Sequence, residues 1–261
     1  MAESSGRTDD CGGSDAILAD QIAYYRAAAA RYDEWWERSG PFDGGPEHRA
    51  DWEAEIAKVR AVLDGFGPLG DVLEIAGGTG NWTQELAQRA ASVAVVDASR
   101  EATTRARAKV AEAGVPVDWT IADIFSWSPP RAYDTVFFSF WLSHVPDDRF
   151  ADFWGLVDRA LAPAGRVFLV DNAHPDLGLG RAPERTCRSG VEVEGISVAG
   201  SPTCTNLETG VSVRELSDRT YSLVKVYWEP EPLRNRLASL GWSFDIATSS
   251  WAFIYGCGQR R

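Results

Sequence analysis

Hydrophobic and polar positions form two kinds of pattern along the 261-residue chain. Short apolar runs bounded by turn residues are typical of strands buried on both faces. Longer stretches with apolar residues three or four positions apart are typical of helices. We expect strands at 72–76, 93–97, 117–121, 133–140, 166–171, 218–228 and 242–257, and helices at 17–38, 51–66, 82–91, 100–112, 147–161 and 230–240.

The alternation of strands and helices fails in one polar, glycine-rich stretch, and this divides the chain. Because a structureless loop of about 40 residues is unusual in a compact domain, we expect an insertion or lid there, with a short hairpin from 191–198 and 211–216. The expected parts are a disordered tail (1–16), an N-terminal helical cap (17–66), a core (67–172), the insertion (173–217) over the substrate, and the C-terminal part of the core sheet (218–261).

The chain is organised around the segment DVLEIAGGTGNWT, from Asp71 to Thr83. An apolar strand runs into a glycine turn, and the turn enters a helical pattern at Trp82. Glycine allows backbone angles that a side chain forbids and lets a ligand approach the main chain. The following helix offers unpaired N–H groups and the positive end of its dipole. The sequence therefore predicts a nucleotide-binding corner.

The turn resembles the E/D-x-G-x-G-x-G signature of class I S-adenosylmethionine (SAM) methyltransferases. It reads Glu74-x-Ala76-x-Gly78-x-Gly80, with alanine in place of the first glycine. A later Leu-x-Pro-x-Gly followed by a strand, at 161–165, also resembles this family. The resemblance implies a Rossmann-like, doubly wound α/β sheet of seven strands, six parallel and one antiparallel, with SAM as cofactor. The G-x-G-x-x-G spacing of dinucleotide dehydrogenases is absent.

Polar residues follow the later strands, where ligands of open α/β sheets bind. Asp97 is expected to accept the ribose hydroxyls, although an N-cap role is the alternative, with Ser99 as a second candidate for the cap. By resemblance Asp123 bonds the adenine amino group, while a turn-forming aspartate is its alternative. His144 is the candidate general base, or a loop histidine that fixes backbone carbonyls.

The aromatic segments Tyr-Tyr-Arg at 24–26 and Tyr-Asp-Glu-Trp-Trp at 32–36 resemble the cap of small-molecule methyltransferases. Aromatic faces stabilise a cation such as a sulfonium, although an amphipathic helix packed on the sheet would look the same. The candidate catalytic residues are His144, Tyr24 and Tyr32, and the candidate substrate contacts are Trp36 and Trp141. The candidate cofactor contacts are Tyr25, Glu74, Ala76, Gly78, Gly80, Trp82, Asp97, Ala98, Asp123, Ile124, Ser139 and Phe140.

Composition excludes several classes of function. The net charge of −12 disfavours a nucleic-acid groove, and no run of 18 apolar residues exists to span a membrane. The polar N-terminus is unlike a secretory signal. Four scattered cysteines and three histidines suggest neither a disulfide framework nor a metal site, and fit a reducing cytoplasm. A small-molecule substrate is the expected partner, and a homodimer is a candidate assembly.

The expected function is methylation of a small apolar or aromatic metabolite, on a hydroxyl or carboxyl oxygen. Three alternatives stay open. The enzyme could cyclise or cleave the amino-acid side chain of SAM and release methylthioadenosine. The chain could bind SAM without catalysis, or it could be a nicotinamide dehydrogenase. The sequence does not identify the acceptor.

Overall fold

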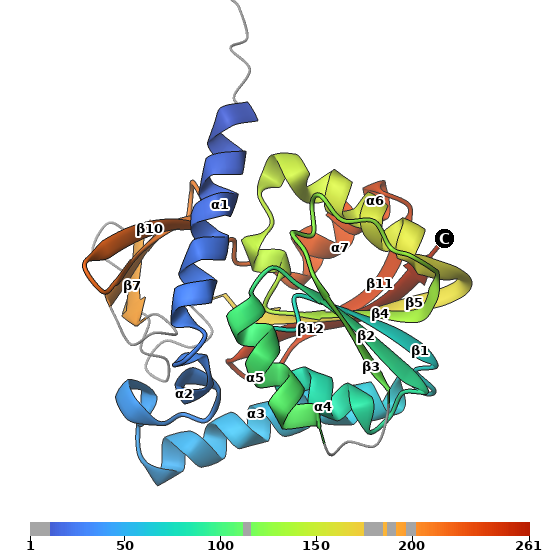
Figure 1. The fold of residues 1–261 in the computed structure, drawn as a ribbon, viewed down its shortest axis with the longest axis horizontal. Coiled ribbons are helices and arrows are strands. Elements are labelled where there is room, and N and C mark those ends of the chain that lie inside the picture. Colours follow the sequence, from blue (N-terminus) through green and yellow to red (C-terminus); the bar gives the residue numbers. More distant parts are fainter. Residues whose placement is uncertain (1–10, 112–115, 175–184, 187–191, 197–201) are drawn as a thin grey trace, which may run out of the picture.

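The computed structural model describes residues 11–111, 116–174, 185–186, 192–196 and 202–261. Its centre is a seven-stranded sheet in the order β11-β12-β5-β4-β1-β2-β3 (Figure 1). Its strands are β1 (Asp71–Ile75), β2 (Ser92–Asp97), β3 (Val117–Ile121), β4 (Tyr133–Ser139), β5 (Leu161–Asn172), β11 (Trp242–Thr248) and β12 (Phe253–Arg260). Six strands of this sheet run in one direction and β12 runs in the opposite direction, so the predicted fold class is confirmed.

Alternate residues of the central strands bury themselves on opposite faces of the sheet, as strand geometry requires. Leu73 and Ile75 pack in one apolar cluster, together with helices α6 (Phe150–Ala160) and α7 (Pro230–Ser239). Val72 packs in the other cluster, with α3 (Pro46–Gly65) and α4 (Asn81–Ala87). The near-continuous apolar runs of the sequence arise from this burial on both faces. Helix α5 (Arg100–Val110) connects β2 to β3 and packs beside α4.

The order of the strands reverses beside β1. The chain runs outward through β2 and β3 and then returns to place β4 on the other side of β1. A crevice at the carboxyl ends of the strands is the usual consequence of such a reversal. The 3-10 helices η2 (Leu142–His144) and η3 (Asp147–Arg149) follow β4 at this end of the sheet.

A second, five-stranded antiparallel sheet lies beside the core, in the order β10-β9-β8-β7-β6. Its strands are β6 (Arg185–Thr186), β7 (Glu192–Ile196), β8 (Pro202–Asn206), β9 (Val211–Leu216) and β10 (Arg219–Val224). The prediction that 218–228 is a core strand is therefore wrong, and the predicted strand 242–257 is two strands, β11 and β12. The predicted hairpin is also wrong, because β8 lies between β7 and β9; residues 191, 197 and 198 lie outside the described part.

The N-terminal segment differs from the single helix predicted at 17–38. Helix α1 (Cys11–Ala28) begins earlier, inside the expected tail, and a turn separates it from α2 (Tyr32–Trp36). The short η1 (Gly40–Phe42) then leads to α3, which begins at Pro46 rather than Asp51. Helix α1 lies between the second sheet and the core (Figure 1). Residues 1–10 of the expected tail lie outside the described residues.

Candidate active site

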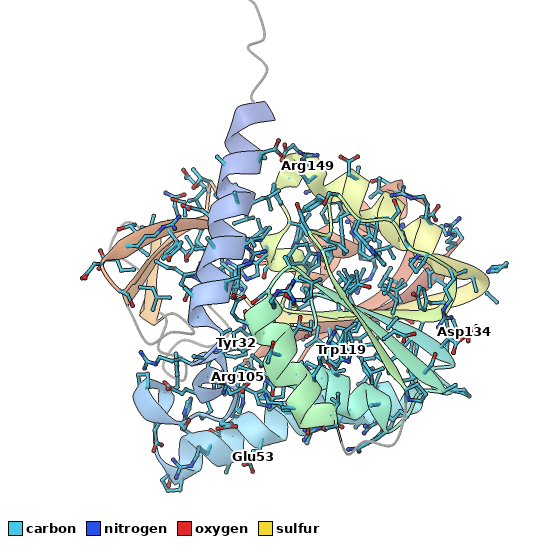
Figure 2. All side chains as sticks on the ribbon, viewed as in Figure 1. Tyr32, Glu53, Arg105, Trp119, Asp134 and Arg149 are labelled. Carbon is cyan, nitrogen blue, oxygen red and sulfur yellow. The ribbon has the colours of Figure 1, made fainter. Side chains whose placement is uncertain are left out.

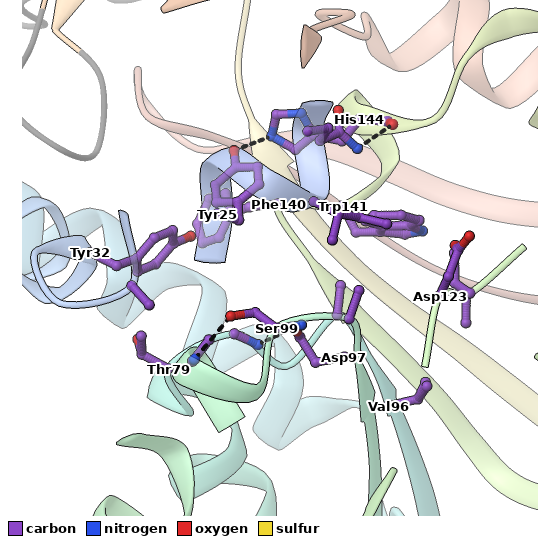
Figure 3. A pocket seen from close by; sticks show the side chains of 18 of the residues that line it. Tyr25, Tyr32, Thr79, Val96, Asp97, Ser99, Asp123, Phe140, Trp141 and His144 are labelled. Carbon is purple, nitrogen blue, oxygen red and sulfur yellow. Dashed lines mark hydrogen bonds between the residues drawn. The ribbon is translucent and has the colours of Figure 1, made fainter. Parts of the chain in front are cut away.

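A cavity opens at the carboxyl ends of β1, β2 and β4, where the strand order reverses (Figure 3). Its volume is about 870 Å³ with the open solvent at its mouth included. Twelve of the predicted site residues line it: Tyr25, Tyr32, Ala76, Gly78, Asp97, Ala98, Asp123, Ile124, Ser139, Phe140, Trp141 and His144. Trp36 and Trp82 line a smaller adjoining cavity of about 280 Å³, which shares Tyr32, Ala76 and Gly78.

The glycine turn leaves space where a ligand must approach the backbone. Gly78 has φ +56°, and a Cβ built on it would meet nothing within 4 Å. Gly80 has φ +85°, and its Cβ would lie 2.8 Å from Ala106 Cα, so this glycine serves close packing of α4 on α5. Ala76 has φ +55°, a left-handed conformation that strains an alanine. The substitution of the first motif glycine is thus tolerated with strain, and the cradle at Gly78 stays open.

Asp97 ties the second strand to this turn. Its Oδ2 accepts the N–H of Gly78 at 2.8 Å, and its Oδ1 accepts the N–H of Ser99 at 2.7 Å. Burial raises the pKa of Asp97, and the two backbone hydrogen bonds oppose that rise. The N-cap of α5 is Ser99, whose Oγ accepts the N–H of Ala102 at 3.0 Å. The carboxylate of Asp97 is therefore not the cap, and it stands in the cavity wall.

Three predicted residues support the site from outside the cavity. Glu74 is 1% exposed and accepts the hydroxyl of Thr83 at 2.6 Å, beneath the turn. Burial raises its pKa to about 8 despite that hydrogen bond. Gly80 packs against Ala106 of α5. Tyr24 is fully buried in a cluster with Tyr221 and Leu223, so it faces β10 and not the cavity.

His144 stands across the cavity from Asp97 (Figure 3). Its Nδ1 lies 2.6 Å from the carbonyl oxygen of Val224, so Nδ1 carries the proton and donates it. Its Nε2 lies 2.8 Å from Tyr25 Oη and therefore accepts the tyrosine proton. Burial, with the charges of Lys225 and Arg214, holds the pKa of His144 well below its usual value. The imidazole ring is therefore neutral. The lone pair on its Nε2 accepts the hydrogen bond from the Tyr25 hydroxyl.

The segment that carries His144 is held from two sides. The N–H of Ser143 donates to Asp171 at the end of β5 (2.8 Å), and the N–H of Val226 donates to the carbonyl of Ser143 (2.8 Å). Lys225 donates to the hydroxyl of Ser143 at 3.1 Å and lies 3.9 Å from the Asp171 carboxylate. The core and the chain leaving the second sheet thus fix the histidine together.

The cap is held against the glycine turn by a buried carboxylate on α2. Asp33 accepts the hydroxyl of Thr79 at 2.6 Å and pairs with Lys109 of α5 at 2.7 Å. Burial favours a higher pKa for Asp33, but the hydrogen bonds from Lys109, Thr79 and Asn81 outweigh it and lower the pKa. Arg26 of α1 donates to the carbonyl of Ala98 at 2.9 Å. These contacts hold Tyr25 and Tyr32 over the strand ends.

The remaining wall is a mixture of apolar and polar groups suited to a nucleoside. Val96, Ala122 and Ile124 lie beside Asp123. Asp123 also has the alternative role of a turn-forming aspartate, since its Oδ1 accepts the N–H of Phe125 at 3.1 Å. A carboxylate oxygen has further lone pairs, so the turn leaves Asp123 able to accept a ligand donor.

Sequence reasoning missed residues that the topology brings to the site. Gln21 and Thr79 line the cavity, and Arg214 of β9 lies behind Tyr25, with Nη1 3.4 Å from Tyr25 Oη. Gln21 is one helical turn from Tyr25 on α1, and Thr79 stands between the two motif glycines, so both carried a usable signal. There was no usable sequence signal for Arg214, because its strand was expected in a hairpin whose position relative to the core was not predicted.

Comparisons with known proteins agree with this geometry. A family model described as a methyltransferase domain matches residues 72–165. The ubiquinone biosynthesis O-methyltransferase of Pseudomonas aeruginosa is 34% identical over 156 residues, 57% of this chain and 61% of that protein. The counterpart in Aeromonas salmonicida is 31% identical over 166 residues, 60% of this chain and 63% of that protein. The chain thus spans less than two thirds of these curated relatives.

Solved structures match over more of the chain. One described as a DhpI-SAH complex is 32% identical with a TM-score of 0.67, and the match covers 94% of this chain and 98% of the other. A DhpI-SAM-HEP complex matches over the same shares, with 32% identity and a TM-score of 0.66. The CcbJ methyltransferase from Streptomyces caelestis, 18% identical with a TM-score of 0.59 over 91% of this chain and 97% of its own, shares the fold.

The fold and cavity define a nucleotide-binding α/β protein with its site at the strand-order reversal. The matched domain and the structural neighbours then identify the family: the chain belongs to the class I SAM-dependent methyltransferases. SAM is the cofactor of this family. The described residues contain no helix that is long and apolar enough to cross a membrane. The homodimer and the cytoplasmic location stay predictions.

Proposed function

We propose that the chain transfers the methyl group of SAM to an oxygen atom of a small molecule. The observation that carries the proposal is that the open turn at Gly78 and the carboxylate of Asp97 face Tyr25 and His144 across one cavity. The O-methyltransferase names of the curated relatives support oxygen as the acceptor atom.

The residues present fit SAM as ligand. Asp97 would accept the ribose hydroxyls, Asp123 would accept the adenine amino group, and Ile124 would pack on the ring. Bound there, SAM supplies an electrophilic methyl group on a sulfonium. The aromatic rings of Tyr32, Phe140 and Trp141 give that cation apolar and π-rich surroundings.

The chain's own contribution is to orient the acceptor and to exclude water, and orientation alone can lower a barrier by about 7–11 kcal/mol. His144 is neutral, and its Nε2 accepts the Tyr25 hydroxyl. A general-base role therefore requires Tyr25 to release it or to relay the proton, and that role stays a prediction. An acceptor oxygen that is already ionised needs no base. The geometry thus suits carboxyl or other acidic oxygens best.

Calorimetric titration with S-adenosylhomocysteine (SAH) and mass spectrometry of reactions with SAM test the proposal. We expect SAH to bind, and SAH to form from SAM in equal amount to a methylated product when a mixture of small aromatic acids and phenols is added. A reaction without acceptor is the control. Methylthioadenosine formed without any acceptor would establish the cyclising alternative, and an absence of heat with SAH would remove the proposal altogether.

A further inference from the structure

One buried cation beside the cavity has no counter-charge in the described part of the chain. Arg214 of β9 is 7% exposed, and no carboxylate among the described residues forms an ion pair with it. Its guanidinium contacts neutral hydroxyls: Nε lies 3.3 Å from Ser212 Oγ, and Nη1 lies 3.4 Å from Tyr25 Oη. It also lies over the ring of Tyr24, with Cζ 5.2 Å from the centroid.

This arrangement is costly for a protein that has no use for the charge. An unpaired buried ion loses its hydration without compensation, and hydroxyl contacts longer than about 3.2 Å restore little of that loss. The neighbouring Lys225 shows the ordinary solution, because it lies 3.9 Å from the carboxylate of Asp171 and bonds Asn172 at 2.7 Å. Arg214 is about as buried as Lys225, but no carboxylate of the described residues forms an ion pair with it.

Arg214 is connected to the cavity through Tyr25. The guanidinium donates to Tyr25 Oη, which donates to His144 Nε2, and His144 Nδ1 donates to Val224. Tyr25 and His144 both line the cavity, so an anion bound against them lies within reach of the guanidinium field. A planar guanidinium also matches the two oxygens of an oxyacid. We infer that the acceptor carries an anionic oxyacid group, a carboxylate or phosphoryl, and that Arg214 selects it.

This inference rests on the proposed function and adds the charge of the substrate. The carboxylate of SAM has the same chemistry and is the other possible source of the anion. Position favours the acceptor. Apart from Tyr25, the expected cofactor contacts stand on β1, β2, β3 and β4 or in the segments that follow these strands. Arg214 comes from the second sheet and lies behind the Tyr25–His144 pair, on the side of the cavity away from Asp97. The two sources are separated by experiment.

The test compares matched acidic and neutral probes on the protein saturated with SAH. Calorimetry would measure the dissociation constants of benzoate, phenylphosphonate and benzamide, which differ chiefly in charge. In the wild type we expect at least one acid to bind about tenfold or more tightly than benzamide. Arg214→Gln should abolish this preference while the affinity for SAH stays within about twofold, and Arg214→Lys should retain part of it.

Arg219→Gln is the matched control. It removes one positive charge from the same sheet, but Arg219 is exposed and pairs with Asp20, so the acid preference should persist. Equal binding of acids and benzamide by the wild type, or no binding of either acid to the SAH complex, overturns the inference. A loss of SAH affinity in Arg214→Gln with the acid preference intact assigns the guanidinium to the cofactor instead. If Arg214→Gln fails to fold, the wild-type ratio and Arg214→Lys still decide. Failure of SAH to bind the wild type would instead refute the proposed function.

Discussion

Replacement of Asp97 by asparagine separates the role of this carboxylate in the fold from its role with the cofactor. In the structure each carboxylate oxygen accepts one backbone N–H, from Gly78 at 2.8 Å and from Ser99 at 2.7 Å. Asparagine keeps one acceptor oxygen and turns an N–H₂ toward the other donor. One hydrogen bond to a charged group is lost, and such bonds contribute about 1.5–3 kcal/mol.

Stability and binding should respond differently to this change. Because burial raises the pKa of Asp97, the folded state disfavours its charge, and the neutral amide relieves part of that cost. We expect the free energy of unfolding without ligand to fall by no more than about 1.5 kcal/mol. The affinity for SAH should fall by about 1.5–3 kcal/mol, roughly 10-fold to 150-fold, because one proposed ribose hydrogen bond to a charged oxygen is also lost.

Asp134→Asn provides a control of the same chemistry. Asp134 accepts the N–H of Asp71 at 2.9 Å, at the end of the sheet away from Tyr32 and the cavity (Figure 2). Urea unfolding and calorimetry with SAH would be measured for both variants. We expect Asp134→Asn to lose about 1 kcal/mol of stability and to bind SAH normally. SAH affinity within twofold of wild type in Asp97→Asn would refute the assignment of Asp97 to the cofactor.

Three further perturbations test the turn and the cap. Ala76→Gly should stabilise the protein by about 0.5–1 kcal/mol in urea unfolding, because relief of a left-handed alanine (about 1–2 kcal/mol) exceeds the added freedom of the unfolded chain; destabilisation would contradict the strain. Burial raises the pKa of Glu74 from 4.5 to about 8, so its contribution to stability is complete below pH 4.5 and is lost as the pH rises toward 8. The wild type loses at most about 1.4 kcal/mol of stability per pH unit in this range. Glu74→Gln should therefore gain stability relative to wild type between pH 5 and pH 8. If the free energies of unfolding of the two proteins change with pH in parallel, Glu74 does not titrate in this range. Asp33→Asn should weaken SAH binding about 3-fold to 10-fold in calorimetry, because the ion pair of α2 with Lys109 is lost while the amide oxygen can still accept a hydrogen bond; unchanged binding would mean that the cap is held by its aromatic packing alone.

Local sequence was sufficient for the glycine turn and for the strand ends of the core. Apolar runs, turn glycines and the residues after each strand are encoded within about ten positions, and a parallel sheet brings its carboxyl ends together without further information. Asp97, Asp123, Ser139 and His144 were therefore expected at one edge, and all four line one cavity. The fold class, which the resemblance to class I methyltransferases implied, is also correct.

Tertiary structure decided what neighbouring residues of one type do. Tyr24 and Tyr25 are adjacent on a helix, where a step of 100° turns one toward β10 and the other toward His144. Glu74 belongs to the motif, but strand alternation directs it beneath the turn to Thr83. The alanine-rich segment at 29–31 has the propensity to continue α1, yet it turns there, and the contacts of Asp33 with Thr79 and Lys109 hold α2 against the glycine turn.

The second sheet could not be derived from sequence by these means. Alternation in 218–228 predicts a strand but not the sheet to which its hydrogen bonds go, because pairing partners are chosen by packing over long separations. Arg214 reaches Tyr25 only through that pairing, across 189 positions of the chain. By itself the sequence determined the edge of the sheet at which this family binds its nucleoside, because short contiguous segments after each strand form that edge. The opposite wall, with His144, Tyr25 and the buried guanidinium, was decided by the tertiary structure, because burial and charge depend on which distant segments meet.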